Sequence, residues 1–223
     1  MISRKFKDYF RNKVWVFLKA KWKLRSGLDI MVENDSDWFV FNEIFTNKEY
    51  DDAIRLLMSS PVTDPLILDL GANVGYFTLK IADELKQSGV NDFTIIAIEA
   101  SPSNFTALAR RVSQPLLKNT VKAYLGLAGH KTGAKTILHS QQHYGHSVSS
   151  GNQDGKSAIV NYLNIETLLN GAEQIDFLKC DIEGSEEIFI SEYSTLLQNV
   201  RIAVFEFHAS ECNVGRCRQM LAD

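Results

Sequence analysis

Residues 66–76 read LILDLGANVGY, and the architecture of the chain can be worked out from them. The first five are mostly apolar and stop at Gly71, the pattern of a short strand buried in a parallel sheet. Gly71 permits a tight turn and a close approach of ligand to backbone. Gly75 then opens a helix. Its apolar face repeats at Val74, Phe77, Ile81 and Leu85. The segment predicts a strand, a ligand-facing turn and a helix.

Further strands and helices alternate along the chain. Strand-like apolar runs cover residues 93–99, 121–127, 175–181 and 200–207, and shorter ones cover 38–41, 135–138 and 158–160. Helical patterns cover residues 50–60, 162–170 and 214–222, and another helix begins at Ser101 and Pro102. Strands that alternate with helices build a parallel sheet covered on both faces. We therefore predict an α/β fold, a Rossmann-like doubly wound, mainly parallel sheet.

The length of 223 residues suits one domain with an N-terminal extension. We predict that residues 1–60 form a basic extension and lead-in elements, and that residues 61–223 form the ligand-binding domain. Cys180, Cys212 and Cys217 are an odd number of cysteines without the paired spacing of a zinc site. Unpaired thiols are typical of reduced intracellular proteins, which favours a cytoplasmic location.

Residues 1–27 are basic, with nine Lys or Arg against Asp8 alone, a charge of +8. The rest of the chain has fifteen basic and twenty-six acidic residues, a charge of −11. Aromatic residues recur among the cations at a roughly helical period, which predicts an amphipathic helix. Such a helix either docks on an anionic membrane or packs against the domain. No later basic groove favours nucleic acid, and no apolar run predicts a signal peptide or a membrane span.

The glycine turn distinguishes between two classes of cofactor. A dinucleotide site has glycine at the middle of G-x-G-x-x-G, because the pyrophosphate needs bare backbone there. This chain has Asn73 at that position, which favours S-adenosylmethionine, a cofactor without phosphate. Asp69 can accept a hydrogen bond from the ammonium group of that cofactor. A nicotinamide-dependent oxidoreductase on the same type of sheet is the alternative interpretation.

Two acidic positions at later strand ends extend the predicted site. Glu99 ends the strand after the glycine turn, where a carboxylate can accept from both hydroxyls of a ribose. Asp181 and Glu183 lie two residues apart at the end of a later strand, so they share a face if that strand is straight. Gly184 turns the chain there. We interpret Glu186 and Glu187 as the dipole-compensated start of the next helix.

Four motifs, taken together, resemble those of the FkbM-type methyltransferases. They are residues 67–77 (ILDLGANVGYF), 98–104 (IEASPSN), 177–186 (FLKCDIEGSE) and 205–208 (FEFH). The second departs from the family pattern, since Ala100 stands where proline is common. The resemblance covers about residues 38–210 and implies that the domain binds S-adenosylmethionine. The expected cofactor-binding residues are Asp69, Gly71, Asn73, Gly75, Tyr76, Glu99, Ala100, Ser101 and Asp181.

The resemblance also implies O-methylation of a small-molecule or glycan acceptor: a sugar, a glycan, or a lipid-linked or polyketide-like hydroxyl. Family members generally continue past the fifth strand with a helix and a terminal β-hairpin. This chain stops at Asp223, so we expect a sheet without that hairpin. A catalytically inactive module that recruits a partner through residues 1–27 is a further alternative.

Methyl transfer to oxygen also needs a group that accepts a proton. We assign Asp181, His208 and Glu183 as the catalytic residues and designate no metal ligands. The three carboxylates of Asp181, Glu183 and Glu206, together with the imidazole of His208, could nevertheless hold a divalent cation. Structural roles for Glu206 and His208 remain equally open. Other histidines, His143 and His146, fall in a polar stretch that we interpret as a solvated loop, with acceptor recognition as the alternative.

Overall fold

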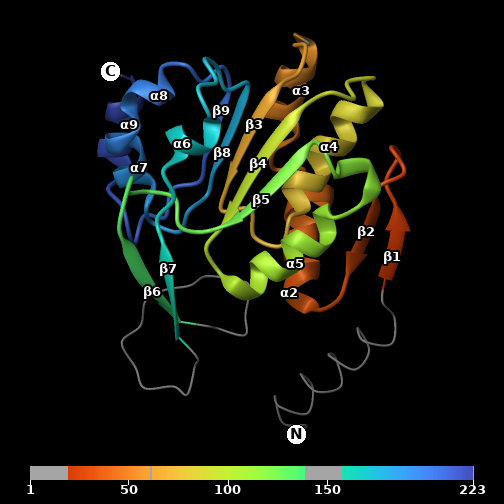
Figure 1. Ribbon diagram of the computed structural model, residues 1–223, viewed down its shortest axis with the longest axis horizontal. Coiled ribbons are helices and arrows are strands. Elements are labelled where there is room, and N and C mark those ends of the chain that lie inside the picture. The colour runs from red at the N-terminus through yellow and green to blue at the C-terminus, as the bar shows by residue number, and fades with distance from the viewer. Residues whose placement is uncertain (1–19, 61, 139–156, 223) are drawn as a thin grey trace, which may run out of the picture.

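The computed structural model describes residues 20–60, 62–138 and 157–222. Its centre is a sheet of five strands in the order β5-β4-β3-β8-β9, with every neighbouring pair parallel (Figure 1). The strands are β3 (Leu66–Leu70), β4 (Thr94–Glu99), β5 (Val121–Leu125), β8 (Phe177–Cys180) and β9 (Ala203–Phe205). The chain winds outward from β3 to β5 and then returns to β8 on the other side of β3. This order confirms the predicted doubly wound sheet and places the crevice at the carboxyl end of β3.

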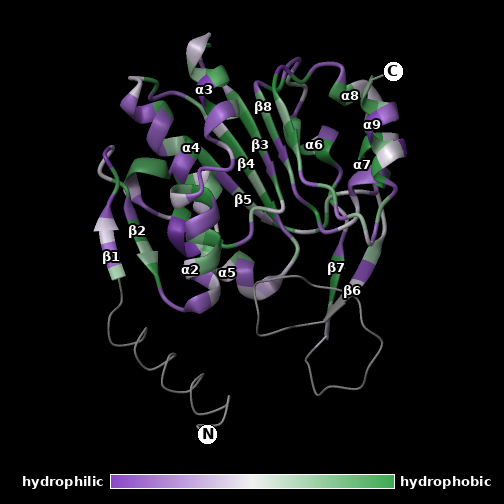
Figure 2. Ribbon diagram, turned by 180° about the vertical axis from the view of Figure 1, so that it is seen from behind, coloured by the Kyte–Doolittle hydropathy of each residue, from purple (hydrophilic) through white to green (hydrophobic). Residues whose placement is uncertain are grey.

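Helices cover both faces of the sheet (Figure 1). One face carries α4 (Tyr76–Gln87) and α5 (Pro102–Val112), which is followed by the short turn η2 (Pro115–Leu117). The other face carries α6 (Ile165–Leu169), α7 (Glu186–Glu192), α8 (Ser194–Leu197) and α9 (Val214–Ala222). Figure 2 shows hydrophobic residues concentrated along the central strands β3, β4 and β8.

The two faces of the sheet have separate hydrophobic cores because side chains alternate along a strand. Ile67 of β3 belongs to the core beneath α4, whereas Leu68 and Leu70 belong to the core beneath α7. Asp69 has the parity of Ile67, so its carboxylate points towards the α4 side. The sheet therefore buries a charged residue of its central strand in a hydrophobic layer.

The lead-in elements pack into the core on the α4 side. They comprise the antiparallel strands β1 (Ala20–Lys23) and β2 (Asp29–Val32), α2 (Asp35–Phe41), η1 (Asn42–Thr46) and α3 (Asp51–Ser59). Leu28, Ile30 and Ile54 are at most 3% exposed and share a core with Ile67. Residues 28–57 and the sheet are thus held together by one continuous hydrophobic cluster.

The predicted strand at residues 38–41 is wrong, because these residues lie in α2. Asn34 caps that helix, accepting a hydrogen bond from the backbone of Asp37 at 2.9 Å. Acidic residues in the first turn, Asp35 and Asp37, also favour the helix through its dipole. These signals at the helix start outweigh the strand propensity of the aromatic and β-branched residues that follow.

The N-terminal segment is described only in part. Residues 20–23 form β1, so the amphipathic helix expected over residues 1–27 does not extend through them. Residues 1–19, and with them most of the basic segment, lie outside the described residues, as do His143 and His146. Within the described ranges, no helix is long and apolar enough to cross a membrane.

The remaining elements follow the sequence pattern. The predicted strands at residues 135–138 and 158–160 are β6 (Ala134–Leu138) and β7 (Ser157–Asn161), which pair antiparallel and project from the sheet (Figure 1). After β9 the chain continues into α9, and the part of the chain that the structure describes contains no hairpin beyond β9.

Candidate functional site

The turn after β3 is held tightly between the ends of its two neighbouring strands. The backbone amides of Gly71 and Ala72 both donate to the carbonyl of Ile98 at the end of β4, at 3.0 and 2.9 Å. Gly71 has φ +73°, and a Cβ atom placed on it would lie 1.6 Å from the backbone oxygen of Asp181. No side chain fits in that space. The backbone of Asp181 therefore packs directly against this turn.

Glu99 connects the turn after β3 with the turn after β4. One carboxylate oxygen accepts from the amide of Asn73 at 2.8 Å, and the other accepts from the amide of Ser101 at 2.7 Å. Burial raises the pKa of Glu99 to about 7, although these two hydrogen bonds act in the opposite direction. Each oxygen keeps a second lone pair, so the carboxylate can still accept from a ligand hydroxyl. Ala100, which follows Glu99 in the turn after β4, is half-buried.

Asp69 is fully buried, and its neighbours belong to the protein itself. Oδ2 accepts from the Thr78 hydroxyl at 2.6 Å, and Oδ1 lies 3.7 Å from the ammonium of Lys179. Among the described residues, Oδ1 has no hydrogen-bond partner. Burial raises the pKa of Asp69, and the charge of Lys179 opposes that shift. Asp69 thus combines an internal ion pair with one unused acceptor.

Lys179 is a site residue that sequence reasoning missed. Its ammonium, on buried strand β8, donates to the carbonyl of Gly71 at 2.9 Å and to Asp181 Oδ2 at 3.3 Å. Burial lowers the pKa of Lys179, but Asp181, Tyr50 and Asp69 outweigh it and raise the pKa above its usual value. A lysine in a fully apolar strand is rarely buried without a partner. The presence of a lysine in an otherwise apolar strand could therefore have indicated a buried ion pair at residue 179.

Two residues predicted to contact the cofactor have side chains with local roles. The Tyr76 hydroxyl donates to the carbonyl of Met31 at 2.7 Å and accepts from Arg111 at 3.2 Å. The Ser101 hydroxyl caps α5 by accepting from the amide of Asn104. The hydroxyl groups of Tyr76 and Ser101 are therefore already bonded within the protein, although Tyr76, like Asn73, lines the cavity at the turn.

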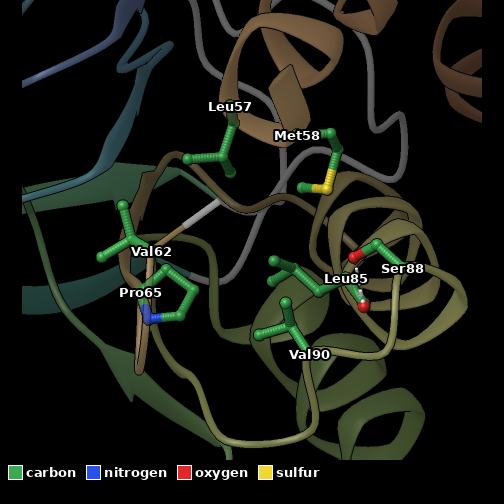
Figure 3. Close-up of a pocket in the computed structure, with 7 residues that line it drawn as sticks. All are labelled: Leu57, Met58, Val62, Pro65, Leu85, Ser88 and Val90. Atoms are coloured by element: carbon green, nitrogen blue, oxygen red, sulfur yellow. Dashed lines mark hydrogen bonds between the residues drawn. The ribbon is translucent and has the colours of Figure 1, made fainter. Parts of the chain in front are cut away.

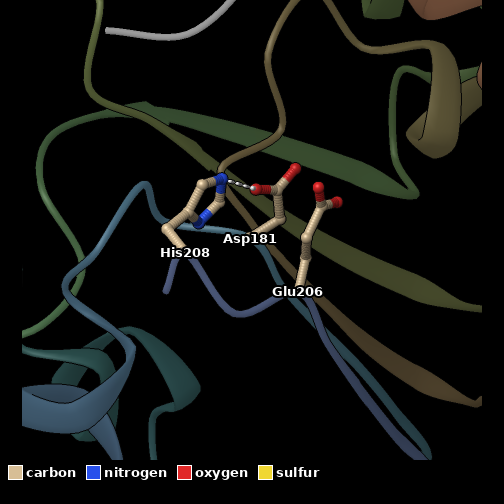
Figure 4. Close-up of side chains that lie close together, drawn as sticks. All are labelled: Asp181, Glu206 and His208. Atoms are coloured by element: carbon tan, nitrogen blue, oxygen red, sulfur yellow. Dashed lines mark ion pairs between the residues drawn. The ribbon is translucent and has the colours of Figure 1, made fainter. Parts of the chain in front are cut away.

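The ends of β8 and β9 bring together Asp181, Glu206 and His208 (Figure 4). Candidate metal-ligand atoms of these three side chains all lie within 4.8 Å of one another. His208 Nε2 is 3.9 Å from Asp181 Oδ1 and 3.2 Å from Glu183 Oε2. The structure thus places the three predicted catalytic residues side by side, with Glu206 among them.

Glu186 contacts His208 of this group. The sequence suggested only that Glu186 compensates the dipole at the start of a helix. It is fully buried at the beginning of α7. Its Oε1 accepts from the amides of Ile182 and Gly184 and lies 3.0 Å from His208 Nδ1. Burial lowers the pKa of His208, but the carboxylates of Glu186 and Glu183 outweigh burial and raise it. The imidazole is therefore fixed in orientation by a buried carboxylate.

A small cavity lies between the turn after β3 and the side chains of Asp181 and Glu206, which follow β8 and β9. Its volume is about 50 Å³. The lining residues are Val40, Glu43, Ile44, Glu49, Tyr50, Gly71, Ala72, Asn73, Tyr76, Phe77, Lys179, Asp181 and Glu206. The first five belong to α2, η1 and the approach to α3, so the lead-in segment covers the glycine turn. Burial, followed by Glu49, Glu206 and Asp181, raises the pKa of Glu43 to about 7.

A larger cavity, about 140 Å³, lies at the opposite end of the strands, where β3 and β4 begin (Figure 3). It is lined by Leu57, Met58, Val62, Pro65, Leu85, Ser88 and Val90. The Ser88 hydroxyl donates to the carbonyl of Leu85 at 2.7 Å and is already used. This cavity offers apolar surface without an ionisable group among its lining residues, so the candidate site is the one at the carboxyl ends of the strands.

Comparison with known proteins identifies the family of the chain. A sequence model of the methyltransferase FkbM domain matches residues 69–222, more than half of the chain. The chain belongs to the FkbM methyltransferase family. Membership confirms the resemblance inferred from the four motifs and contradicts the oxidoreductase alternative. S-adenosylmethionine is accordingly the cofactor of this methyltransferase domain.

Solved structures of methyltransferases are similar at a distance. The methyltransferase FkbM from Methylobacillus flagellatus KT has 17% identity and a TM-score of 0.41; the match covers 62% of this chain and 31% of that one. The N-terminal domain of human METTL16 in complex with SAH has 14% identity and a TM-score of 0.43, over 92% and 82% of the two chains. The present chain thus spans about a third of the length of the M. flagellatus protein. No curated protein sequence matches it.

Proposed function

We propose that this domain is an O-methyltransferase that transfers a methyl group to a hydroxyl of a small-molecule or glycan acceptor. One observation carries the proposal: Asp181 touches the Gly71 turn, and His208 lies beside Asp181. Asp181 and His208, two side chains that can accept a proton, therefore lie next to the turn that we expect to hold the methyl donor. General acid–base catalysis of this kind contributes roughly 10²–10⁴-fold in rate.

The residues of the turn fit the methyl donor. Within the described ranges, Asp69 Oδ1 and Asn73 Oδ1 are buried acceptors without a hydrogen-bond partner, and buried acceptors are costly unless a donor reaches them. We assign these atoms to the polar end of S-adenosylmethionine and Glu99 to its ribose hydroxyls. When bound, the cofactor supplies a methyl group on a sulfonium.

The lead-in segment must move for the donor to bind. A cavity of about 50 Å³ is far smaller than the roughly 300–1,000 Å³ that ligand pockets usually occupy. Val40, Glu43 and Ile44 close it from the side of α2 and η1. We propose that these elements cover the donor site and open for binding.

On the acceptor side, we assign His208 and Glu183 to proton transfer and Asp181 to positioning. His208 Nδ1 is committed to Glu186, so Nε2 is the imidazole atom that faces Asp181 and Glu183. Asp181 also contacts Lys179, which holds the Gly71 carbonyl. Asp181 thereby ties the acceptor side of the site to the donor side.

A methyl-transfer screen tests this function. The full chain is incubated with radiolabelled S-adenosylmethionine and panels of glycans, lipid-linked sugars and small alcohols, and calorimetry measures binding of S-adenosylhomocysteine in parallel. We expect transfer to a hydroxyl acceptor that is lost in His208→Ala. Binding without transfer to any acceptor would instead support the inactive-module alternative. Absence of binding would contradict the assignment of the donor site.

We also propose that residues 1–27 place the protein at an anionic membrane surface in the cytoplasm. The +8 charge of this segment and its interleaved aromatic residues support the proposal. Because β1 starts at Ala20, the comparison should use a chain that begins there, so that β1 and β2 stay paired. We expect the full chain to sediment with anionic liposomes and the shortened chain to stay in solution. If neither sediments at low salt, the segment is a packing element.

A further inference from the structure

Three side chains at the ends of β8 and β9 have the composition of a metal site. Asp181 and Glu206 offer carboxylate oxygens and His208 offers an imidazole nitrogen, all within 4.8 Å of one another (Figure 4). Oxygen ligands lie about 2.0–2.6 Å from Mg²⁺ or Ca²⁺, so two ligands on opposite sides of one ion are about 4–5 Å apart. The spacing therefore suits a single ion after small side-chain rotations.

The surroundings of His208 supply a second, independent indication. A histidine that binds a metal almost always donates its other ring N–H to a carboxylate or carbonyl, which fixes its orientation. Buried Glu186 occupies that place, 3.0 Å from His208 Nδ1, and two backbone amides hold Glu186 in turn. The other ring nitrogen, Nε2, faces the carboxylates of Asp181 and Glu183, at 3.9 and 3.2 Å.

The charge of the adjoining cavity points the same way. Its lining includes four carboxylates, those of Glu43, Glu49, Asp181 and Glu206, but only one ammonium, that of Lys179. Carboxylates collected in a partly buried place repel one another unless a cation compensates them. A divalent cation bound by Asp181 and Glu206 reduces this repulsion.

We infer that Asp181, Glu206 and His208 bind one divalent cation that favours oxygen ligands, such as Mg²⁺ or Mn²⁺. Two carboxylates and one imidazole leave coordination positions for water or for an acceptor oxygen. The cation is a Lewis acid that makes an acceptor hydroxyl more acidic.

The catalytic use of this site rests on the proposed function. The acceptor oxygen forms a bond to the methyl carbon while the carbon–sulfur bond breaks, and that electron pair stays on sulfur. The hydroxyl proton passes to Glu183, whose Oε2 lies 3.2 Å from His208 Nε2. His208 is then a ligand, and Glu183 takes over proton removal.

Manganese binding tests the inference without donor or acceptor. The full chain, freed of metal with EDTA, is titrated with Mn²⁺ and followed by electron paramagnetic resonance. We expect one Mn²⁺ per chain, with coupling to an imidazole ¹⁴N. His208→Ala should abolish that coupling and weaken binding at least about 10-fold, and Glu206→Gln should weaken it similarly. Glu186→Gln should weaken it about 10–100-fold, with folding checked by circular dichroism.

His130 provides the matched control. Its Nδ1 lies 2.6 Å from Glu192, the same pairing of imidazole and carboxylate. Among the described residues, however, the only group of three or more potential metal ligands is Asp181, Glu206 and His208, so His130 does not belong to one. His130→Ala should bind Mn²⁺ like the unmodified chain. The inference is overturned if Mn²⁺ does not bind at millimolar concentration, or if His208→Ala and Glu206→Gln bind it unchanged.

The same preparation separates this inference from the proposed function. Calorimetry with S-adenosylhomocysteine in EDTA measures the donor site alone. Donor binding without Mn²⁺ binding overturns the metal site and leaves the methyltransferase assignment intact. Mn²⁺ binding with the expected variant pattern but without donor binding supports the metal site and contradicts the donor assignment.

Discussion

One cavity lies at the carboxyl ends of the parallel strands, called the carboxyl edge of the sheet, and another lies at their amino ends, called the amino edge. The two cavities differ in the residues that line them. The amino edge has the larger one, about 140 Å³, with apolar side chains and one serine hydroxyl that is already bonded. The carboxyl edge has about 50 Å³, but its lining includes four carboxylates, a buried lysine and the Gly71 turn. Parallel strands direct their loops and ligand crevice to the carboxyl edge. The chemistry of the lining, rather than the volume, is thus the reason for proposing the site at the carboxyl ends of the strands.

The sharpest test compares two glycines, one from each edge. Both have positive φ, +73° at Gly71 and +88° at Gly89. A Cβ atom on Gly71 would collide with the Asp181 carbonyl, whereas nothing lies within 4 Å of one on Gly89. We expect Gly71→Ala to lose more than about 3 kcal/mol in free energy of unfolding, together with donor binding. Gly89→Ala should lose only about 1 kcal/mol, from its strained backbone. Equal losses in urea unfolding would contradict the described turn.

A second pair compares aspartates. Asp181→Asn should lower the rate of methyl transfer about 100-fold or more, because the charge between donor and acceptor sides is lost. It should also lower the melting temperature, since buried Lys179 loses its closest carboxylate, at 3.3 Å. Asp92→Asn, at an exposed position before β4, should change neither quantity. Full activity in Asp181→Asn would contradict the positioning role proposed for Asp181.

Glutamates form the third pair. Glu99→Gln keeps the shape of the side chain but presents an NH₂ group to one of the two backbone donors and removes the charge. We expect affinity for S-adenosylhomocysteine to fall about 10-fold or more, the loss of one charge-assisted hydrogen bond. Glu173→Gln, in the exposed turn ahead of β8, should bind normally. An unchanged affinity in folded Glu99→Gln would contradict the ribose assignment.

The raised pKa of Glu99 predicts a pH dependence. Between its ordinary pKa of 4.5 and its folded value of about 7, the folded chain keeps a proton that the unfolded chain releases. The free energy of unfolding should therefore fall as the pH rises through this window, by at most about 3 kcal/mol. Donor affinity should rise across pH 7, as the carboxylate ionises. Urea unfolding and calorimetry measure both trends, and both should flatten in Glu99→Gln.

The smallest expected effect belongs to the amino edge. Val90→Ile adds one methylene to the wall of the larger cavity, and burying it should increase the free energy of unfolding by about 0.8 kcal/mol. Donor affinity and methyl transfer should stay unchanged, because the cavity is remote from the Gly71 turn. A change in donor affinity would mean that the two ends of the sheet are coupled.

Local patterns predicted more of the fold than of the site. The glycine turn, the strand ends at Glu99 and Asp181, and α9 follow from periodicity and turn chemistry. The prediction failed at residues 38–41, where Asn34 and the acidic first turn of α2 prevail over strand propensity. The sequence did not predict the contacts of Lys179 and Glu186. Their partners, the Gly71 carbonyl and the His208 imidazole, lie at distant positions along the chain.

The sequence by itself determined that an apolar strand stops before Gly71, that Glu99 ends a second strand, and that Asp181 directly follows a third strand of the same sheet. These are consequences of side-chain period and of the conformations open to glycine. The tertiary structure alone decided that Lys179 joins Asp181 to the turn, that Glu186 orients His208, and that α2 and η1 cover the cavity. Such contacts join residues distant along the chain, and only the packing of the elements brings their polar atoms within bonding distance.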